Sequence, residues 1–559
     1  MWLARLLVAA VSVAVVAGTD KTLVEQEVAA LNLGVACMLL GSIGFMMGVF
    51  YMVNHYDQDM VVYTWKVICA TISIFVSVLM FQAVHGVFQS AFLVGASRST
   101  RTIAAFAHSF GWFLVLQVFL AVVSGAVSFP GASGPLDQQE PEERKRAADK
   151  LFLDLKCWGI ILGHITGFAA INAWCHLQQY ASGSVFQAFL AVPVSGCMIW
   201  LFYMLTDVVR EKIALADDGV KDEFEQAWDE ATEETEDDVM GLTLSYILVQ
   251  AIRYAVIGVL PDSEGNLPAT VRVSNIQILI LMGIGVSIAA LSFSRTILVK
   301  RSFGRISTWS RLVCDFTFSW SIMYALESFF AMHGLGGEAA GCLGQVILAF
   351  LVTILSFFII FLLDKEADKF ENMAGVRNKR TQDAIRSVVA ALGVLIGFSW
   401  EKCFEAAVDD TAQKAAVVFP PCVLKLVMAL VLAIIVVPAW RWYILPVLKD
   451  LDAFDEAEEE TDDADSVSVT NCDGGCVYHR LSTSSDVTLA PSESARAVDA
   501  KARGIIRFLS SQLESKQARI DFLERTLAQT SASPCVSMAP TLLPHHVHTT
   551  GLKPLGSSD

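Results

Sequence analysis

Eleven long apolar runs dominate this sequence and decide what it can fold into. Each run reaches or exceeds about 20 residues, the length that an α-helix needs to cross a bilayer. Lipid cannot satisfy backbone polar groups, so such runs form helices. The alternating segments of a membrane barrel are absent. The predicted fold is all-α, a polytopic transmembrane helical bundle over residues 34–448, with runs at 34–54, 62–93, 102–127, 154–178, 185–208, 241–260, 274–294, 309–333, 340–364, 384–408 and 418–446.

Composition supports a membrane protein and excludes several other classes. The chain is 54% hydrophobic and 17% charged, which leaves too little polar surface for a soluble domain. No basic patch interleaved with aromatic residues is present, so nucleic acid is not an expected partner. The sequence also lacks nucleotide-binding, zincin and nucleophile-elbow motifs. We therefore predict no cofactor, no metal site and no catalytic residue.

The N-terminus and the basic loops predict an orientation. Residues 1–18 combine Arg5, an apolar core and a small residue, Gly18, which is the pattern of a signal peptide. An uncleaved anchor is the alternative. Lys and Arg gather at 144–150, 295–311 and 364–380, which share one side of an eleven-span protein. The positive-inside rule makes that side cytosolic. The segment 19–33 is then luminal or extracellular, and the C-terminus is cytosolic, in the secretory pathway or plasma membrane.

Two acidic stretches hold much of the net charge of −17, at 217–238 and 450–465. The first lies on the cytosolic side between the fifth and sixth runs. Its apolar residues have helical spacing, which favours a short juxtamembrane helix, whereas its acidity fits a solvated loop equally well.

The C-terminal tail has a different composition from the membrane domain. Residues 449–494 are acidic and Ser/Thr-rich, which predicts a disordered linker, and 530–559 also resembles a disordered tail. Residues 495–529 predict a coiled-coil helix, either self-associating into a homo-oligomer or docking on a partner helix. Its apolar seam consists of Ile506, Leu509, Leu513, Ile520, Leu523 and Leu527.

Polar residues concentrate in the even-numbered runs. Ionisable groups within a membrane are costly and usually face a bundle interior or a water-filled cavity. In the fourth run they share one broad helix face, so the polar faces of the even helices are expected to meet one another. The candidate ion-pathway residues are His85, His164, Asn172, His176, Gln250, Arg253, Asp315, Tyr324, Glu327, Glu401 and Glu405. An ion pair of Arg253 with Glu327 or Glu401 is expected.

A faint internal repeat accompanies this alternation. Phe318-Ser319-Trp320 recurs as 398–400, and an aromatic residue follows both at the same offset. The pattern predicts a two-helix unit, one plain helix and one polar helix, repeated about five times in the same orientation. Chance in an aromatic-rich chain is the alternative.

Three functions fit these observations. The first is a channel or carrier for an ion or small polar solute, in which the even helices surround a polar cavity. The second is a membrane scaffold or receptor-like protein that acts through its cytosolic tail, with the buried polar groups serving as interhelical contacts. The third is an intramembrane enzyme that uses His164 or His176 with a carboxylate, which ranks last.

Overall fold

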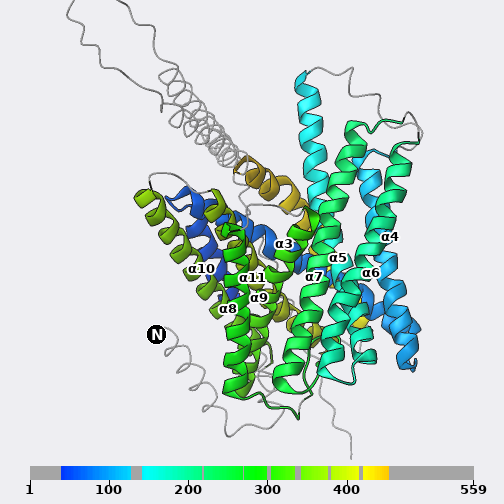
Figure 1. Cartoon of the computed structure of the whole chain (residues 1–559), viewed down its shortest axis with the longest axis vertical. Helices are drawn as coiled ribbons and strands as arrows, with labels where there is room; N and C mark the ends of the chain where they lie inside the picture. The colour runs from blue at the N-terminus through cyan, green and yellow to red at the C-terminus, as the bar shows by residue number, and fades with distance from the viewer. Residues whose placement is uncertain are drawn as a thin grey trace, which may run out of the picture. The chain divides into compact units, whose positions relative to one another are not determined.

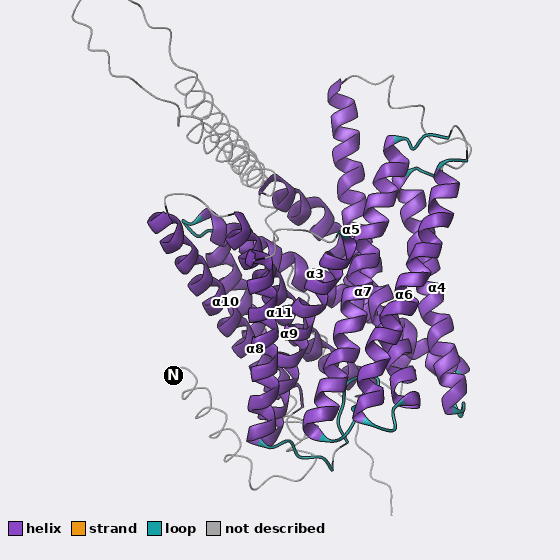
Figure 2. Cartoon of the chain, in the orientation of Figure 1, coloured by secondary structure: helices purple, strands orange, loops and turns teal. Residues whose placement is uncertain are grey.

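The computed structural model describes residues 39–127, 141–216, 219–268, 270–298, 304–333, 341–374, 379–414 and 420–451. Regular structure in these residues is helical, which confirms the all-α fold class (Figure 2). The helices are α3 (Gln58–Phe92), α4 (Arg98–Ser124), α5 (Pro141–Ala181), α6 (Val185–Ala214), α7 (Glu223–Ile257), α8 (Asn275–Leu298), α9 (Arg305–Met332), α10 (Gly341–Ala374), α11 (Lys379–Lys414) and α12 (Pro421–Ala439). The predicted signal peptide, segment 19–33, coiled coil and tail lie outside the described residues.

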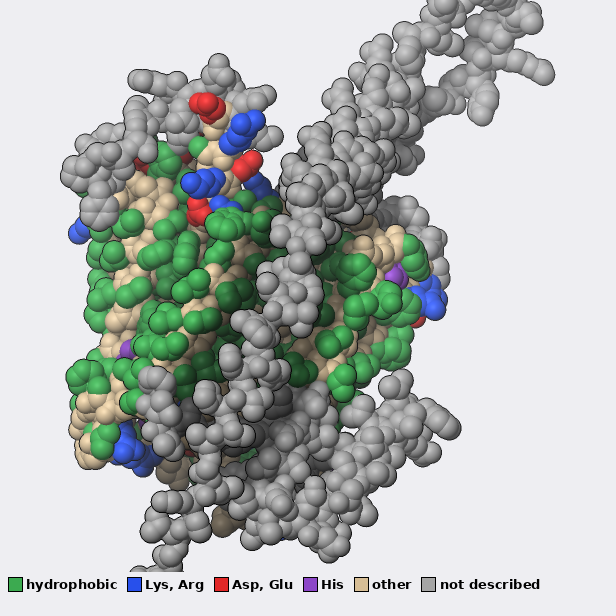
Figure 3. Space-filling view, turned by 180° about the vertical axis from the view of Figure 1, so that it is seen from behind, with side chains coloured by type: hydrophobic (Ala, Val, Ile, Leu, Met, Phe, Trp, Pro, Cys, Tyr) green, Lys and Arg blue, Asp and Glu red, His purple; other side chains and the backbone are tan. Residues whose placement is uncertain are grey.

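Nine helices in the described part of the chain are long and apolar enough to cross a membrane. The shorter apolar helix Leu39–Val53 and the helix α9 are not among them, so the count of eleven spans stays a prediction. A broad band of hydrophobic side chains separates charged groups at the two ends of the helices (Figure 3). The chain is therefore an integral membrane protein.

Five helices, labelled α3, α5, α7, α9 and α11 in Figure 1, form an inner ring through their contacts. Each packs against the next in this order, and α11 packs against α3 to close the ring. The contacts advance together along neighbouring helices. Gly163 and Gly167 of α5 lie close to Thr235 and Leu242 of α7, in the same order along both helices. In the same way, Ser319 Oγ of α9 donates to the Ala391 carbonyl of α11, and Trp320 stacks on Phe398. Such contacts require neighbouring inner helices to run parallel.

The remaining helices form an outer layer. α4 packs on α5, α6 on α7, α8 on α9, α10 on α11, and α12 on α3. In the apolar stretches of α3, α5, α7 and α11, 56% to 78% of residues are buried, against 6% to 39% in the outer helices. The outer helices expose residues such as Phe186, Leu279 and Ile434. The polar helices are thus shielded by plain helices that present apolar side chains outward.

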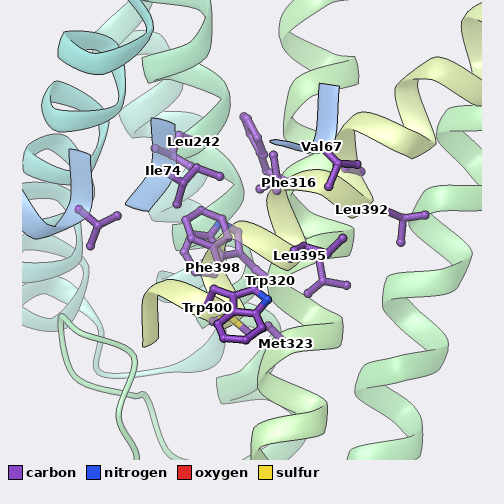
Figure 4. Packing of buried hydrophobic residues seen from close by; sticks show 14 of the residues in the cluster. Val67, Ile74, Leu242, Phe316, Trp320, Met323, Leu392, Leu395, Phe398 and Trp400 are labelled. Atoms are coloured by element: carbon purple, nitrogen blue, oxygen red, sulfur yellow. The ribbon is translucent and has the colours of Figure 1, made fainter. Parts of the chain in front are cut away.

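Hydrophobic side chains, with Trp320, Phe398 and Trp400 among them, pack between the inner helices (Figure 4). Each inner helix contributes one aromatic ring to a connected set: Phe81, Phe168, Tyr246, Trp320 and Phe398. Trp320 stacks on Phe398 with ring centroids 3.8 Å apart, and Tyr246 meets the edge of Trp320 at 4.9 Å. Such pairs add about 0.5–1.5 kcal/mol each beyond their burial.

The acidic segment before the sixth run belongs to a membrane helix. α7 begins at Glu223, capped by a reciprocal pair of Asp222 and Glu225, and continues without a break to Ile257. The helical interpretation of 217–238 is confirmed from Glu223 onward, whereas the solvated-loop interpretation is wrong there. The prediction that this acidic segment is separate from the sixth apolar run is also wrong, because α7 contains both. Similarly, α10 runs to Ala374 through much of the predicted loop 364–380.

Replacing Gly241 by Ala should destabilise the ring. A Cβ there would lie 2.7 Å from Leu312 Cβ, an atom fixed close to the α9 backbone, so the helices must separate. We expect a loss of about 1–3 kcal/mol, the usual cost of overpacking, seen as a lower thermal unfolding midpoint in detergent. Gly283→Ala is the matched control, because Gly283 is exposed on α8 with open space around it. Equal midpoints for the two variants would contradict the close approach.

Candidate functional site

A buried ion network joins four helices where the inner helices begin. Its centre is Glu236 of α7, whose side chain is fully buried. Glu236 accepts from Arg210 of α6 at 3.2 Å, from Arg305 of α9 at 2.9 Å and from Gln117 of α4 at 3.0 Å. Two guanidinium groups and an amide therefore compensate this carboxylate, which otherwise would be costly to bury.

Further carboxylates of α6 and α7 complete the network. Arg210 is 2% exposed and also pairs with Asp229 at 2.6 Å and Asp207 at 2.9 Å. Arg305 also pairs with Asp237 at 2.5 Å. Lys221 donates to Asp229 at 2.8 Å, and this hydrogen bond raises the pKa of Lys221. Four acidic residues of the stretch thus pair with arginines on other helices: Asp229, Glu233, Glu236 and Asp237.

A cavity of about 800 Å³ lies beside this network between α4, α5 and α7. Acidic side chains dominate its charged lining, including Asp222, Glu234 and Asp238. Lys156 forms an ion pair with Glu234 at its edge. Charged side chains therefore reach an open space at this end of the molecule.

Arg253, Gln250 and Tyr324 come together where the inner helices end. Arg253 is 3% exposed, and its Nη1 donates to the Gly265 carbonyl at 2.7 Å and to Gln250 Oε1 at 3.1 Å. Its guanidinium lies over the Tyr324 ring, 3.8 Å from the centroid. The predicted ion pair is wrong, because no carboxylate of the described chain lies within 4 Å of Arg253. A backbone carbonyl and an aromatic face take that place.

Glu401 and Glu405 of α11 share a partner that sequence analysis missed. Gln82 of α3 donates to Glu405 at 2.7 Å and lies 3.4 Å from Glu401. Glu401 is 3% exposed, and Lys402 pairs with Glu405 at 3.5 Å. Gln82 and Glu405 line a cavity of about 270 Å³ between α3, α11 and α12. We call Gln82, Glu401, Lys402 and Glu405 the carboxylate cluster.

Other predicted residues occupy separate positions. Asp315 accepts from Ser292 of α8 at 3.1 Å and from Ser387 of α11 at 2.6 Å, so it links three helices. On α5, His164 Nδ1 and Asn172 Nδ2 are buried without a hydrogen-bond partner among the described residues. Unpaired polar atoms of this kind are rare in folded proteins and call for a physical explanation.

Among the described residues, the histidines form no acid–base pair with a carboxylate. His85 lies against His108 of the outer helix α4, with Nδ1 atoms 3.4 Å apart. His176 and Glu327 are half-buried, and neither has a hydrogen bond or ion pair within the described ranges. An intramembrane enzyme built on His164 or His176 therefore lacks support from the geometry.

Sequence reasoning also missed the partners of the ion network. Arg210 and Arg305 count only as basic residues near loops in a topology argument, and Glu236 as one acid among many. The one available indication was helical periodicity reaching back from the sixth run into the acidic stretch. That periodicity places Asp229, Glu233, Glu236 and Asp237 at spacings of four, three and one along one helix.

Removing Glu236 should destabilise the fold far more than removing its neighbour Glu233. Glu236→Ala leaves the buried Arg210 and the half-buried Arg305 with fewer acceptors, and we expect a loss of about 3 kcal/mol or more. Glu233→Ala, whose side chain is 49% exposed, should change stability by roughly 1 kcal/mol or less. Thermal unfolding in detergent measures both. A Glu236→Ala protein as stable as Glu233→Ala would show that the network is dispensable.

Comparison with protein-family models, with curated proteins and with solved structures finds no match to this chain. The geometry of this molecule is therefore the basis for inferring its function.

Proposed function

We propose that this chain is a multi-pass membrane transport protein, a channel or carrier for an ion or small polar solute. One observation carries the proposal: ionisable and amide side chains are buried inside a ring of helices that plain outer helices shield. Arg253, Gln250 and Glu401 are each no more than 3% exposed. Polar groups so expensive to keep in a membrane usually mark a path for a polar substrate.

The proposed path has polar groups at both ends and an aromatic layer between them. The carboxylate cluster and Arg253 lie where the inner helices end, and the Arg210–Glu236–Arg305 network lies where they begin. Phe168, Trp320 and Phe398 lie between them. This filled centre favours a closed state of a carrier or gated channel, in which transport requires the inner helices to move relative to one another.

We also propose an orientation and an oligomeric state. The start of the inner helices faces the cytosol, following the distribution of Lys and Arg. The N-terminus is then luminal or extracellular, in the secretory pathway or plasma membrane. The helix at 495–529 joins copies of the chain or a partner helix.

The ring itself supports the proposed repeat. Each of α5, α7, α9 and α11 packs against the outer helix that precedes it in the chain. Serine hydroxyls also bridge inner neighbours in the same way: Ser77 donates to the Ile161 carbonyl at 3.1 Å, and Ser319 donates to the Ala391 carbonyl at 2.6 Å. A two-helix unit used about five times would produce such an arrangement.

Flux through liposomes tests the transport proposal. We expect purified protein to carry an ion, and Glu401→Gln or Glu327→Gln to reduce the rate about tenfold or more, as a barrier ~1.4 kcal/mol higher would. Glu366→Gln is the matched control, because that carboxylate is 59% exposed on α10. Absence of flux for every common inorganic ion would contradict the proposal, as would equal rates in all variants.

A membrane scaffold is the second candidate, and the aromatic filling of the ring favours it. A scaffold needs a rigid bundle, and its output would come from the cytosolic tail. Deleting residues 495–559 separates the two functions. A scaffold would lose partner recruitment, whereas a transporter that needs the tail only for assembly would still conduct.

The same deletion tests oligomerisation. We expect light scattering of the detergent-solubilised full chain to give a multiple of the 60.9 kDa mass, and the deleted chain to give a single copy. Leu513→Asp and Leu523→Asp should act like the deletion, because charges in an apolar seam oppose its burial. A full chain that is monomeric would contradict self-association and leave docking on another protein as the role of the tail.

A further inference from the structure

We propose that the membrane domain binds a small monovalent anion, such as nitrate, a halide or a short carboxylate, at Arg253 and Gln250 of α7. This inference deepens the proposed transport function by naming the class of substrate. It depends on that function only for its role, because binding can be measured without transport. The site lies beside Tyr246 of α7 and Tyr324 of α9 (Tyr324 Oη donates to Tyr246 Oη at 3.0 Å).

Arg253 is a buried positive charge without a negatively charged partner among the described residues. Arg253 is buried at 3% exposure, yet throughout the described chain its side chain forms no ion pair. Its recorded contacts are the Gly265 carbonyl, Gln250 Oε1 and the Tyr324 ring. A guanidinium that has left water is stabilised strongly only when an anion compensates it.

The buried polar atoms without a hydrogen-bond partner at this position are donors. Arg253 Nε and Gln250 Nε2 are both buried and have no hydrogen-bond partner in the described structure. The orientation of the Gln250 amide is fixed, because its Oε1 accepts from Arg253 Nη1 and a guanidinium can only donate. Its Nε2 is therefore a donor. A ligand at this position must supply acceptors, which excludes a metal cation or an ammonium group.

The guanidinium of Arg253 presents its Nε–Nη2 edge to a ligand. Nη1 is occupied by the Gly265 carbonyl, whereas Nε has no partner. The Nε–Nη2 edge is a fork that matches two oxygens of a planar oxyanion. Cation–π contact with Tyr324 holds the plane of the group. Nitrate and carboxylates fit this edge in a bidentate manner, and a halide would bind it less specifically.

Neighbouring side chains extend the donor-rich surroundings. Trp320 Nε1 is buried without a partner, and Trp320 packs against both Tyr246 and Tyr324. Gly265 presses against the two tyrosines, since a Cβ there would lie 2.2 Å from Tyr324 Oη. Aromatic walls and a close loop favour an anion that gives up its water readily, because desolvating a divalent anion costs much more.

Anion-dependent thermal stability tests the proposal with the purified full-length protein in detergent. Sodium gluconate, whose anion is bulky, is replaced stepwise by sodium nitrate, chloride, acetate or sulfate at constant ionic strength. We expect a saturable rise in the unfolding midpoint with the three small monovalent anions and none with sulfate, because a ligand that binds only the folded state stabilises it. The relative size of the nitrate, acetate and chloride effects distinguishes a planar oxyanion from a halide.

Three variants make the result specific. Arg253→Gln should weaken anion binding about 10- to 100-fold, the loss expected for a charged hydrogen bond. Gln250→Leu should weaken it less while leaving the charge intact. Arg98→Gln, which removes an exposed arginine at the start of α4, should bind like wild type.

The outcomes decide between the proposals. Unsaturable midpoint shifts of equal size in wild type and Arg253→Gln would indicate a general salt effect and overturn the site. If Arg253→Gln does not fold, Arg253→Lys replaces it; that variant lacks the fork, and unchanged nitrate affinity in it and in Gln250→Leu would overturn the site equally. Saturable binding without flux would refute transport and keep the anion site. Cation flux without an anion effect would do the reverse.

Discussion

Lipid forms no hydrogen bonds, and this constraint determines the architecture of the molecule. Each helix satisfies the hydrogen bonds of its own backbone, whereas its polar side chains must be shielded from lipid by neighbouring helices. The chain meets this requirement with two layers. Helices α3, α5, α7, α9 and α11 carry the polar groups and form a closed ring, and plain helices cover it. The alternation of plain and polar helices along the sequence thus becomes an outside and an inside in space.

Within the ring, different forces act at different depths. Charged pairs among Arg210, Glu236 and Arg305 join α6, α7 and α9 where the inner helices begin. Stacked rings of Phe168, Trp320 and Phe398 hold the centre. Toward the other end, polar groups are buried with incomplete partners, as at Arg253 and Gln250. The first two regions explain stability, whereas the third has a surplus of donors that stability does not require. That surplus is the reason for assigning a ligand there.

Particular elements show how far sequence reasoning reaches. The apolar runs could be read directly from the sequence, as could the polar character of the even-numbered runs, which belong to α3, α5, α7, α9 and α11. Both follow from the order of apolar and polar residues along one helix. The ion pair predicted for Arg253 failed, because a helix pattern gives the face of a side chain and not the identity of what lies opposite. The Gly265 carbonyl that replaced the expected carboxylate comes from a loop with no comparable periodicity. Gln82 was overlooked beside His85 for the same reason, since only the packing of α3 on α11 brings it to Glu405.

The sequence by itself determined that this is a helical membrane protein with its polarity concentrated in alternate helices. The length of an apolar run and its helical periodicity are local properties, so they can be recognised without knowledge of the fold. The tertiary structure alone decided that those alternate helices are parallel neighbours in a closed ring, that aromatic rings fill its centre, and that Arg253 is buried without a carboxylate. These facts depend on contacts between residues separated by a whole helix or more in the chain, and such contacts are set by packing rather than by local pattern.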